Sequence, residues 1–154
     1  MAIEILQDDL ASTQVHALIN EHLNGMHGSS PPGHVNALAI SSLQDPSVTF
    51  WTAWIDGNLC GCGALKQLDS RTGEVKSMRT RPAYLGMGVG QSILDRIMLT
   101  AIERGYSRLL LETGTGPSFE PAHRLYQRNG FEWSGAFGDY TATDFNVFMV
   151  KRLG

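Results

Sequence analysis

Three glycines at alternating positions, Gly86, Gly88 and Gly90, stand between a strand-like run and a helix-like run. Because glycine has no Cβ atom, each of them lets the backbone turn tightly around a ligand. A helix that begins near Gly90 would direct its free N–H groups and its positive dipole end at this turn. The spacing therefore predicts a site for an anion, above all a phosphate group. A strand-to-helix turn without a ligand is the alternative.

Two familiar phosphate-binding patterns do not fit this stretch. A Walker A loop would continue with Gly-Lys-Ser or Gly-Lys-Thr, which does not follow here. A dinucleotide fingerprint has the spacing G-x-G-x-x-G within βαβ units, whereas this chain has G-x-G-x-G and mostly hairpin-like connections. The following helix is well defined, since it ends at Gly105 and has one apolar stripe: Ile93, Leu94, Ile97, Met98, Ala101 and Ile102.

The composition is that of an ordinary soluble protein. The chain has 154 residues, of which 42% are hydrophobic and 18% charged, so we expect one domain over residues 1–154. The net charge is −3 and no run of Lys or Arg is present, which disfavours a nucleic-acid partner. The sequence shows no signal peptide and no apolar stretch of about 20 residues. We therefore expect a cytoplasmic protein without a membrane partner.

The two cysteines, Cys60 and Cys62, stand two residues apart on an expected strand. That spacing predicts that both side chains point to the same face. Two such ligands are too few for a structural zinc site, and no paired histidines accompany them, so we expect no bound metal. We interpret both as buried free thiols in a reducing compartment.

The hydrophobic pattern predicts an α/β (α+β) protein with the order β-α-α-β-β-β-α-β-α-β-β, without repeats or linkers. This order favours a mixed sheet of about seven strands with flanking helices. We expect Asp8 or Asp9 to cap the first helix and a loop over residues 25–34. The expected strands are 3–6, 48–55, 59–68, 74–80, 107–112, 131–136 and 146–151, and the later helices lie within 35–43, 90–105 and 117–130.

The glycine loop and a later helix resemble those of the GNAT superfamily of acyl-CoA-dependent N-acetyltransferases. The loop of that family, Q/R-x-x-G-x-G/A, matches at Gly88 and Gly90, with Leu85 where Gln or Arg is usual. The pattern A-x-x-L-Y-x-x-x-G-F matches at every fixed position from Ala122 to Phe131. Other segments resemble a bacterial subgroup of small single-domain GNAT proteins: 30–32, 61–65, 74–79, 111–114 and 137–140.

This resemblance implies acetyl-CoA as co-substrate, bound mainly by backbone groups. The pantetheine arm would lie where one strand splays from the next, against the peptide groups of Met78, Arg79 and Thr80. The phosphates would lie on the loop, whose backbone contacts do not depend on the side chain at Leu85. The loop residues are Gly86, Met87, Gly88, Val89, Gly90 and Gln91.

The resemblance also implies two catalytic residues. Tyr126 matches the tyrosine that many GNAT enzymes place beside the thioester sulfur as a general acid, and its ordinary pKa of about 10 keeps it protonated. Glu74 matches a strand glutamate that acts as general base, directly or through water, and alternation predicts that it shares a face with Met78. The alternatives are a packing aromatic at Tyr126 and a solvated Glu74 paired with Lys76 or Lys66.

Four further residues are weaker candidates. His123, one helical turn before Tyr126, is a rival base, with an exposed helix histidine as the alternative. His34 lies in the Gly/Ser/Pro-rich loop, and Asp139 and Tyr140 lie in a connection between the last strands. In GNAT proteins these two regions commonly form the acceptor pocket, although turn chemistry alone also explains such residues.

The resulting hypothesis is an N-acetyltransferase in which an amine attacks acetyl-CoA directly within a ternary complex. The acceptor is a small-molecule amine or a protein amino group, and exposed strands near the C-terminus suggest a homodimer. The main alternative is a non-catalytic acyl-CoA-binding or sensor domain. A covalent route through a cysteine lacks a recognised motif, and the acidic net charge disfavours a tRNA-acetylating toxin.

Overall fold

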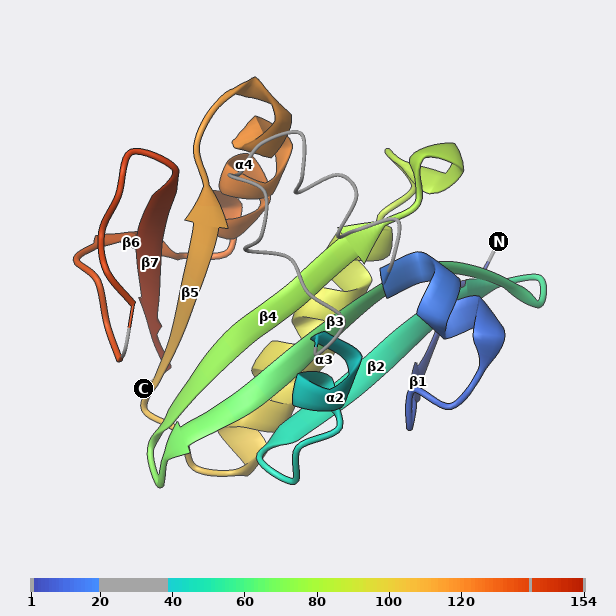
Figure 1. Ribbon diagram of the computed structural model, residues 1–154, viewed down its shortest axis with the longest axis horizontal. Helices are drawn as coiled ribbons and strands as arrows, with labels where there is room; N and C mark the ends of the chain where they lie inside the picture. The colour runs from blue at the N-terminus through green and yellow to red at the C-terminus, as the bar shows by residue number, and fades with distance from the viewer. Residues whose placement is uncertain (1, 20–38, 139, 154) are drawn as a thin grey trace.

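The computed structural model describes residues 2–19, 39–138 and 140–153, which form a seven-stranded mixed sheet with helices on both faces (Figure 1). Within the described ranges the strand order is β1-β2-β3-β4-β5-β7-β6, and only β4 and β5 pair in parallel. This arrangement confirms the predicted fold class and element order. The strands are β1 Glu4–Gln7, β2 Val48–Ile55, β3 Asn58–Asp69, β4 Thr72–Thr80, β5 Arg108–Gly114, β6 Glu132–Ser134 and β7 Asn146–Arg152.

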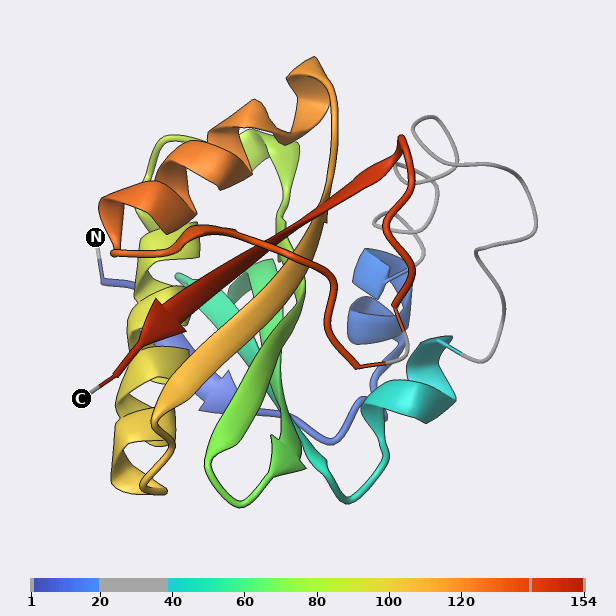
Figure 2. The same cartoon turned by 90° about the vertical axis from the view of Figure 1, so that its left-hand side faces the viewer.

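The helices form a layer on each face of the sheet. In Figure 2, α3 and α4 lie on one face, while the helical residues 13–19 and α2 lie on the other. No helix in the described residues is both long enough and apolar enough to cross a membrane. The helices are α2 Ala39–Leu43, α3 Val89–Glu103 and α4 Glu120–Arg128, with short 3-10 turns η1 Pro82–Tyr84 and η2 Pro117–Phe119.

Helix α3 supplies the larger of two cores. Five of its side chains are buried against the sheet: Val89, Ile93, Leu94, Ile97 and Ala101. The predicted stripe is wrong at Ile102, which is 56% exposed. One residue turns a helix by about 100°, so Ile102 lies off the row that Ile93, Ile97 and Ala101 form.

The second core lies on the opposite face, beneath residues 13–19 and α2. Val15, Leu18 and Ile19 pack there against strand residues such as Phe50. The helix is capped by Ser12, whose Oγ accepts a hydrogen bond from Val15 N at 3.2 Å. The predicted caps, Asp8 and Asp9, do not cap the helix. Their side chains accept hydrogen bonds from Leu10 N and Ala11 N respectively, each two residues later in the chain, and so form turns.

A β-bulge interrupts the pairing of β2 with β3. The register shifts between Ala53 and Trp54, which leaves Cys60 as an extra residue on β3. An extra residue reverses the alternation of side chains beyond it. Cys60 therefore lies in the core under α3, whereas Cys62 lies in the opposite core. The prediction that both face one way is wrong, although both are buried and free.

A second bulge lies in β4, where Ser77 and Met78 together stand opposite Gly63. Ser77 has a φ of 55°, the left-handed conformation that a non-glycine residue rarely adopts. Met78 consequently packs with Val75 in the core under α3. Because neighbouring residues alternate, Glu74 faces the other side of the sheet. The prediction that Glu74 and Met78 share a face is therefore wrong.

The parallel ladder between β4 and β5 is short. It pairs residues Thr72 to Val75 with Arg108 to Leu111, yet β4 continues to Thr80 and β5 to Gly114. Figure 1 shows the two strands diverging beyond this ladder, with α4 at the end of β5. The backbone of the second half of β4 therefore has one side without a partner from β5.

Candidate active site

The glycine loop joins β4 to α3 through left-handed backbone. Gly86 and Gly88 have φ angles of 78° and 86°, which favour glycine over any residue with a Cβ atom. Gly88 is the N-cap of α3, and no side chain of the described residues caps this helix. The third glycine has a different role, because a Cβ atom at Gly90 would lie 3.2 Å from Leu125 Cδ2. The loop thus presents backbone N–H groups at a helix N-terminus, as an anion site requires.

The other loop side chains point to different surroundings. Val89 is buried in the core under α3, and Met87 is exposed. Gln91 binds the C-cap residue of α4, since Asn129 Nδ2 donates to Gln91 Oε1 at 2.9 Å. Gln91 Nε2 also donates to Asp95 Oδ1 at 2.7 Å. With Val89 and Gln91 engaged in this way, the backbone is the main binding surface that the loop offers.

The last residues of β4 lead directly into this loop. Met78 packs under α3, while Arg79 pairs with Cys62 across the β3–β4 ladder. Thr80 pairs with Gly61 and ends the strand. The peptide groups of all three lie beyond the β4–β5 ladder, so their unpaired side is suited to binding an extended ligand.

Helix α4 extends from the glycine loop to the end of β5. Leu125 approaches Gly90, and the ring of His123 is 2.9 Å from the Gly114 carbonyl oxygen through Nε2. Since a carbonyl only accepts, Nε2 donates and carries the hydrogen. His123 also packs edge-on against Trp133, with ring centroids 5.1 Å apart. The rival base is thus held by structural contacts.

Tyr126 lies on the same helix and is buried in the core under α3. Its ring packs against Phe131 with centroids 5.6 Å apart. Burial raises the pKa of the Tyr126 hydroxyl above its ordinary value, so the group is protonated at neutral pH. The hydroxyl can therefore act as a hydrogen-bond or proton donor.

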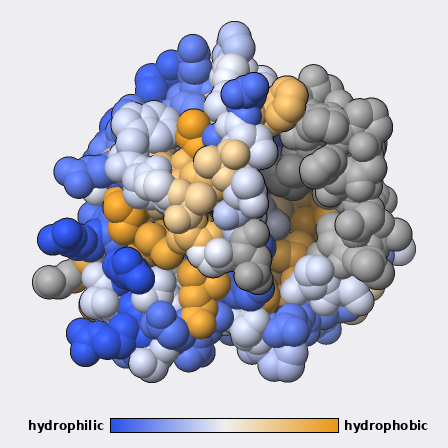
Figure 3. Space-filling view, turned by 60° about the vertical axis from the view of Figure 1, so that its left-hand side comes forward, coloured by the Kyte–Doolittle hydropathy of each residue, from blue (hydrophilic) through white to orange (hydrophobic). Residues whose placement is uncertain are grey.

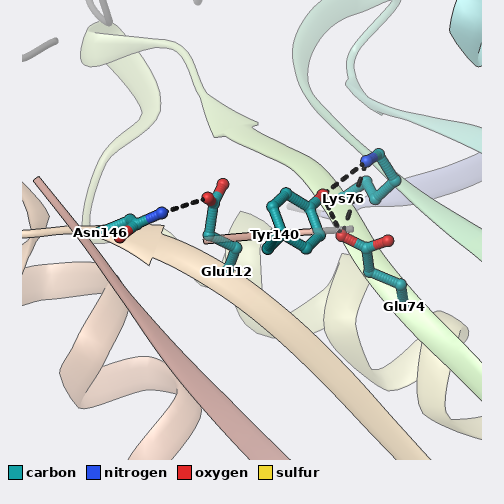
Figure 4. Close-up of polar contacts among 5 residues, drawn as sticks. All are labelled: Glu74, Lys76, Glu112, Tyr140 and Asn146. Atoms are coloured by element: carbon teal, nitrogen blue, oxygen red, sulfur yellow. Dashed lines mark hydrogen bonds and ion pairs between the residues drawn. The ribbon is translucent and has the colours of Figure 1, made fainter. Parts of the chain in front are cut away.

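Glu74 forms a three-residue cluster on the opposite face of the sheet (Figure 4). Tyr140 Oη donates a hydrogen bond of 2.6 Å to Glu74 Oε2. Lys76 Nζ donates to Tyr140 Oη at 3.1 Å and lies 3.5 Å from Glu74 Oε2. Glu74 is only 3% exposed, which contradicts the alternative of a solvated carboxylate, although its predicted pairing with Lys76 is present.

This cluster borders a cavity of about 300 Å³ between the sheet and the β6–β7 connection. Burial and the bond to Glu74 raise the pKa of Tyr140, which keeps its hydroxyl protonated. The Tyr140 ring packs against Phe137 and Phe148, at 5.2 Å and 5.8 Å between centroids. The cavity is lined by Lys66, Leu68, Glu74, Lys76, Phe137, Gly138 and Tyr140.

Sequence reasoning missed Glu112. Its Oε2 accepts a bond of 2.8 Å from Asn146 Nδ2, and it lies one residue beyond the β4–β5 ladder (Figure 4). Leu110 pairs with Glu74, so alternation places Glu112 on the same face as Glu74. Its position as a carboxylate directly after the three leucines 109–111 was the available signal.

The cavity lining is partly apolar, since it includes Leu68 and Phe137. Figure 3 shows one face of the molecule, on which hydrophobic side chains gather in the middle and hydrophilic ones lie along the left and lower margins. Two of the predicted acceptor residues, His34 and Asp139, lie outside the described residues. Tyr140 is therefore the predicted acceptor residue that the structure places beside Glu74.

Comparison with known proteins gives the same fold and a consistent activity. Residues 13–131 match the model of the Acetyltransferase (GNAT) family. The chain is 49% identical over 146 residues to the Uncharacterized N-acetyltransferase YsnE of Bacillus subtilis, covering 95% of this chain and 97% of that protein. It is 44% identical over 149 residues to YedL of Escherichia coli, also an Uncharacterized N-acetyltransferase, covering 97% and 94%.

A third relative is the IAA acetyltransferase of Azospirillum brasilense, 36% identical over 135 residues, which cover 86% of this chain and 87% of that protein. Among solved structures, an acetyltransferase from Streptococcus agalactiae has a TM-score of 0.78 at 26% identity, with 98% of each chain covered. A GNAT acetyltransferase from Elizabethkingia anophelis, with acetyl-CoA bound, has a TM-score of 0.74 at 18% identity and 98% coverage of each chain. That last likeness concerns the fold alone.

Proposed function

Because the chain belongs to the GNAT family of acetyltransferases, we propose that it acetylates the primary amine of a small molecule held beside Glu74, Lys76 and Tyr140. The observation that carries this proposal is the buried Glu74–Tyr140 hydrogen bond at a cavity next to the point where β4 leaves β5. A buried carboxylate beside a cavity is a typical general base. GNAT proteins use acetyl-CoA as the acetyl donor, and we propose the same donor here.

The proposed donor site consists of two backbone surfaces. The peptide groups of Met78, Arg79 and Thr80 would bind the pantetheine arm, since β5 does not pair with this part of β4. The loop residues 86–91 would bind the diphosphate through N–H groups at the start of α3. A structure of the same fold from Elizabethkingia anophelis has acetyl-CoA bound, so the fold can hold this donor.

The proposed reaction needs two proton transfers around one acyl transfer. The acceptor nitrogen attacks the thioester carbon, a C–N bond forms and the C–S bond breaks, giving an amide and CoA. Glu74 takes the proton that the nitrogen loses, directly or through water. Tyr126 supplies a proton to the departing sulfur, and the phenol then takes a new proton from solvent. An oriented general acid or base typically accelerates such a proton transfer by about 10²- to 10⁴-fold.

A small-molecule acceptor fits the site better than a protein chain does. The cavity has a volume of about 300 Å³, and Phe137 and Tyr140 are among its lining residues. That volume is at the lower end of the range for small-ligand pockets, about 300 to 1,000 Å³.

A thiol-release assay tests the proposal. Purified protein with acetyl-CoA is offered a panel of small amines and one lysine-containing peptide, and free CoA is followed with time. We expect amine-dependent release and an acetylated amine product by mass spectrometry. Binding of CoA without turnover of any amine would contradict the proposal and favour a sensor domain. Turnover of the peptide alone would contradict the small-molecule acceptor.

Three other expectations concern the chain as a whole. We propose that residues 1–154 act as one acetyltransferase domain, since both cores pack on the same sheet. The cytoplasmic location and the homodimer stay predictions.

A further inference from the structure

Arg79 has a buried polar atom without a partner. Its Nε has no hydrogen bond among the described residues, although it is shielded from solvent. Other arginines of the chain have acceptors: Arg104 donates to Thr49 Oγ1 at 2.8 Å and Arg108 to Thr72 Oγ1 at 3.4 Å. Burying a donor of a charged group without an acceptor is costly, so such a group calls for an explanation.

The β4 bulge places Arg79 on the face of the acceptor cavity. Arg79 pairs with Cys62, whose side chain lies in the core on the side of residues 13–19. The Arg79 charge partly offsets the rise in the pKa of Cys62 that burial causes. Met78, one residue earlier, points to the opposite face. Arg79 thus shares its face with Glu74 and lies between Glu74 and the glycine loop.

The spacing along β4 suits one small molecule. A strand rises about 3.3 Å per residue, so the Cα atoms of Glu74 and Arg79, five residues apart, are at most about 17 Å from each other. Both side chains are long and extend from the same face, so the gap between the carboxylate and the guanidinium can be shorter than that. An acceptor whose nitrogen lies near Glu74 can therefore reach the guanidinium with a second group.

Among the described residues, Arg79 is a cation of this face that forms no ion pair, as is Lys66 at the cavity. Lys76 is 3.5 Å from the Glu74 carboxylate, and this is the ion pair found among the residues that the structure describes. Arg79 forms no ion pair with a carboxylate among the residues that the structure describes. A guanidinium presents N–H groups in a fork that matches a carboxylate, which makes an acid group its natural ligand.

We propose that the acceptor is a small amino acid, whose carboxylate binds the guanidinium of Arg79 while its amine lies at Glu74. This inference rests on the proposed acetyltransferase function and names the chemical class of its acceptor. An alternative anion for Arg79 is a phosphate of acetyl-CoA. If Arg79 binds the acceptor carboxylate, its loss affects the acceptor; if it binds a phosphate, its loss affects acetyl-CoA. One experiment therefore distinguishes the two anions.

The experiment compares acceptors that differ only in the acid group. The pairs are 4-aminobutanoate with butylamine and β-alanine with propylamine, and each is assayed by kcat/KM at saturating acetyl-CoA. We expect the wild type to prefer the acid in at least one pair by about tenfold or more, the worth of a charge-assisted hydrogen bond. In Arg79→Met this preference should fall to about one, and Arg79→Lys should retain part of it.

The ratio is insensitive to a general loss of activity, because both members of a pair share the same donor and the same enzyme. Arg104→Met is the matched control, since it removes the same charge at the far end of α3 and should keep the preference. A wild type without acid preference, or an Arg79→Met variant that keeps it, would overturn the inference. So would a rise in the KM for acetyl-CoA with an unchanged acceptor ratio.

A binding measurement covers the case in which turnover of the panel is slow. The same acids are titrated into wild type and Arg79→Met saturated with CoA, and binding is followed by NMR. We expect binding of at least one acid to the wild type and loss of it in the variant. If no acid of the panel binds, the inference fails. The proposed function fails separately, when CoA binds and no amine of either kind is acetylated.

Discussion

The glycine loop and the acceptor cavity both adjoin strand β4, yet they are built in opposite ways. The loop uses consecutive residues and presents backbone N–H groups at the start of α3. The cavity uses side chains from distant parts of the chain, since Glu74 and Tyr140 are 66 residues apart in sequence. A backbone site tolerates different side chains, as Leu85 illustrates, whereas a side-chain site changes with each substitution. The donor is therefore a property of the family, and the acceptor is a property of this chain.

The largest effect is expected from Gly88→Val, which alters the backbone site. Gly88 has a φ of 86°, and a β-branched side chain there would distort the loop and occupy the place of a phosphate. We expect no CoA binding by calorimetry at concentrations that saturate the wild type. Gly57→Val is the matched control, because Gly57 has a φ of 79° and equally open surroundings in a distant hairpin. Equal CoA affinity in the two variants would show that the loop is not part of the donor site.

Glu74→Gln attacks the side-chain site and should lower turnover at neutral pH by about ten- to a thousandfold if the carboxylate is the base. The loss should shrink as pH rises, because more of the amine is then already deprotonated. The measurement is kcat against pH for both proteins with the same acceptor. Glu112→Gln, on the same face and bound to Asn146, is the control and should lose less. A deficit that is constant with pH would show that Glu74 only positions other groups.

Tyr126→Phe should have a smaller effect, about tenfold on turnover, because water can replace a lost proton donor at a good leaving group. Burial raises the pKa of Tyr126, so its hydroxyl is protonated from pH 7 to 9 and the loss should be the same throughout that range. Parallel pH profiles for the variant and the wild type check this. The contrast with Glu74→Gln distinguishes acid from base.

Tyr106→Phe is the matched control for Tyr126→Phe. The Tyr106 hydroxyl is buried and has no hydrogen-bond partner among the described residues, so its removal should leave turnover unchanged and should not lower the melting temperature. If both phenylalanine variants lose the same activity, the ring environment and not the hydroxyl of Tyr126 is responsible.

The same contrast between local and distant contacts explains what the sequence predicts well. Local patterns predicted the element order, the glycine turn and the buried row of α3, and the structure confirms them. Two bulges, at Cys60 and at Ser77, reversed the faces expected from strict alternation. A bulge depends on the pairing with the neighbouring strand, so the strand's own residues do not reveal it.

The acceptor cavity was predicted only in part for a related reason. Glu74 and Tyr140 were each selected as candidates, but no local pattern indicates that they share a hydrogen bond of 2.6 Å. Lys76 was assigned only as a possible partner of Glu74, and its bond to Tyr140 depends on how the β6–β7 connection folds back over the sheet. Such contacts between distant segments require the three-dimensional structure.

The short ladder between β4 and β5 also has a consequence for solubility. Beyond Val75 and Leu111 the sheet has two inner edges, in addition to its outer strands β1 and β6. An open strand edge is a template for pairing with another extended chain, and charged side chains discourage such pairing. Arg79 and Glu112 place opposite charges beside these inner edges. A donor arm bonded to the β4 backbone would cover one of them, so the supply of acetyl-CoA should protect the enzyme from aggregation as well as sustain its turnover.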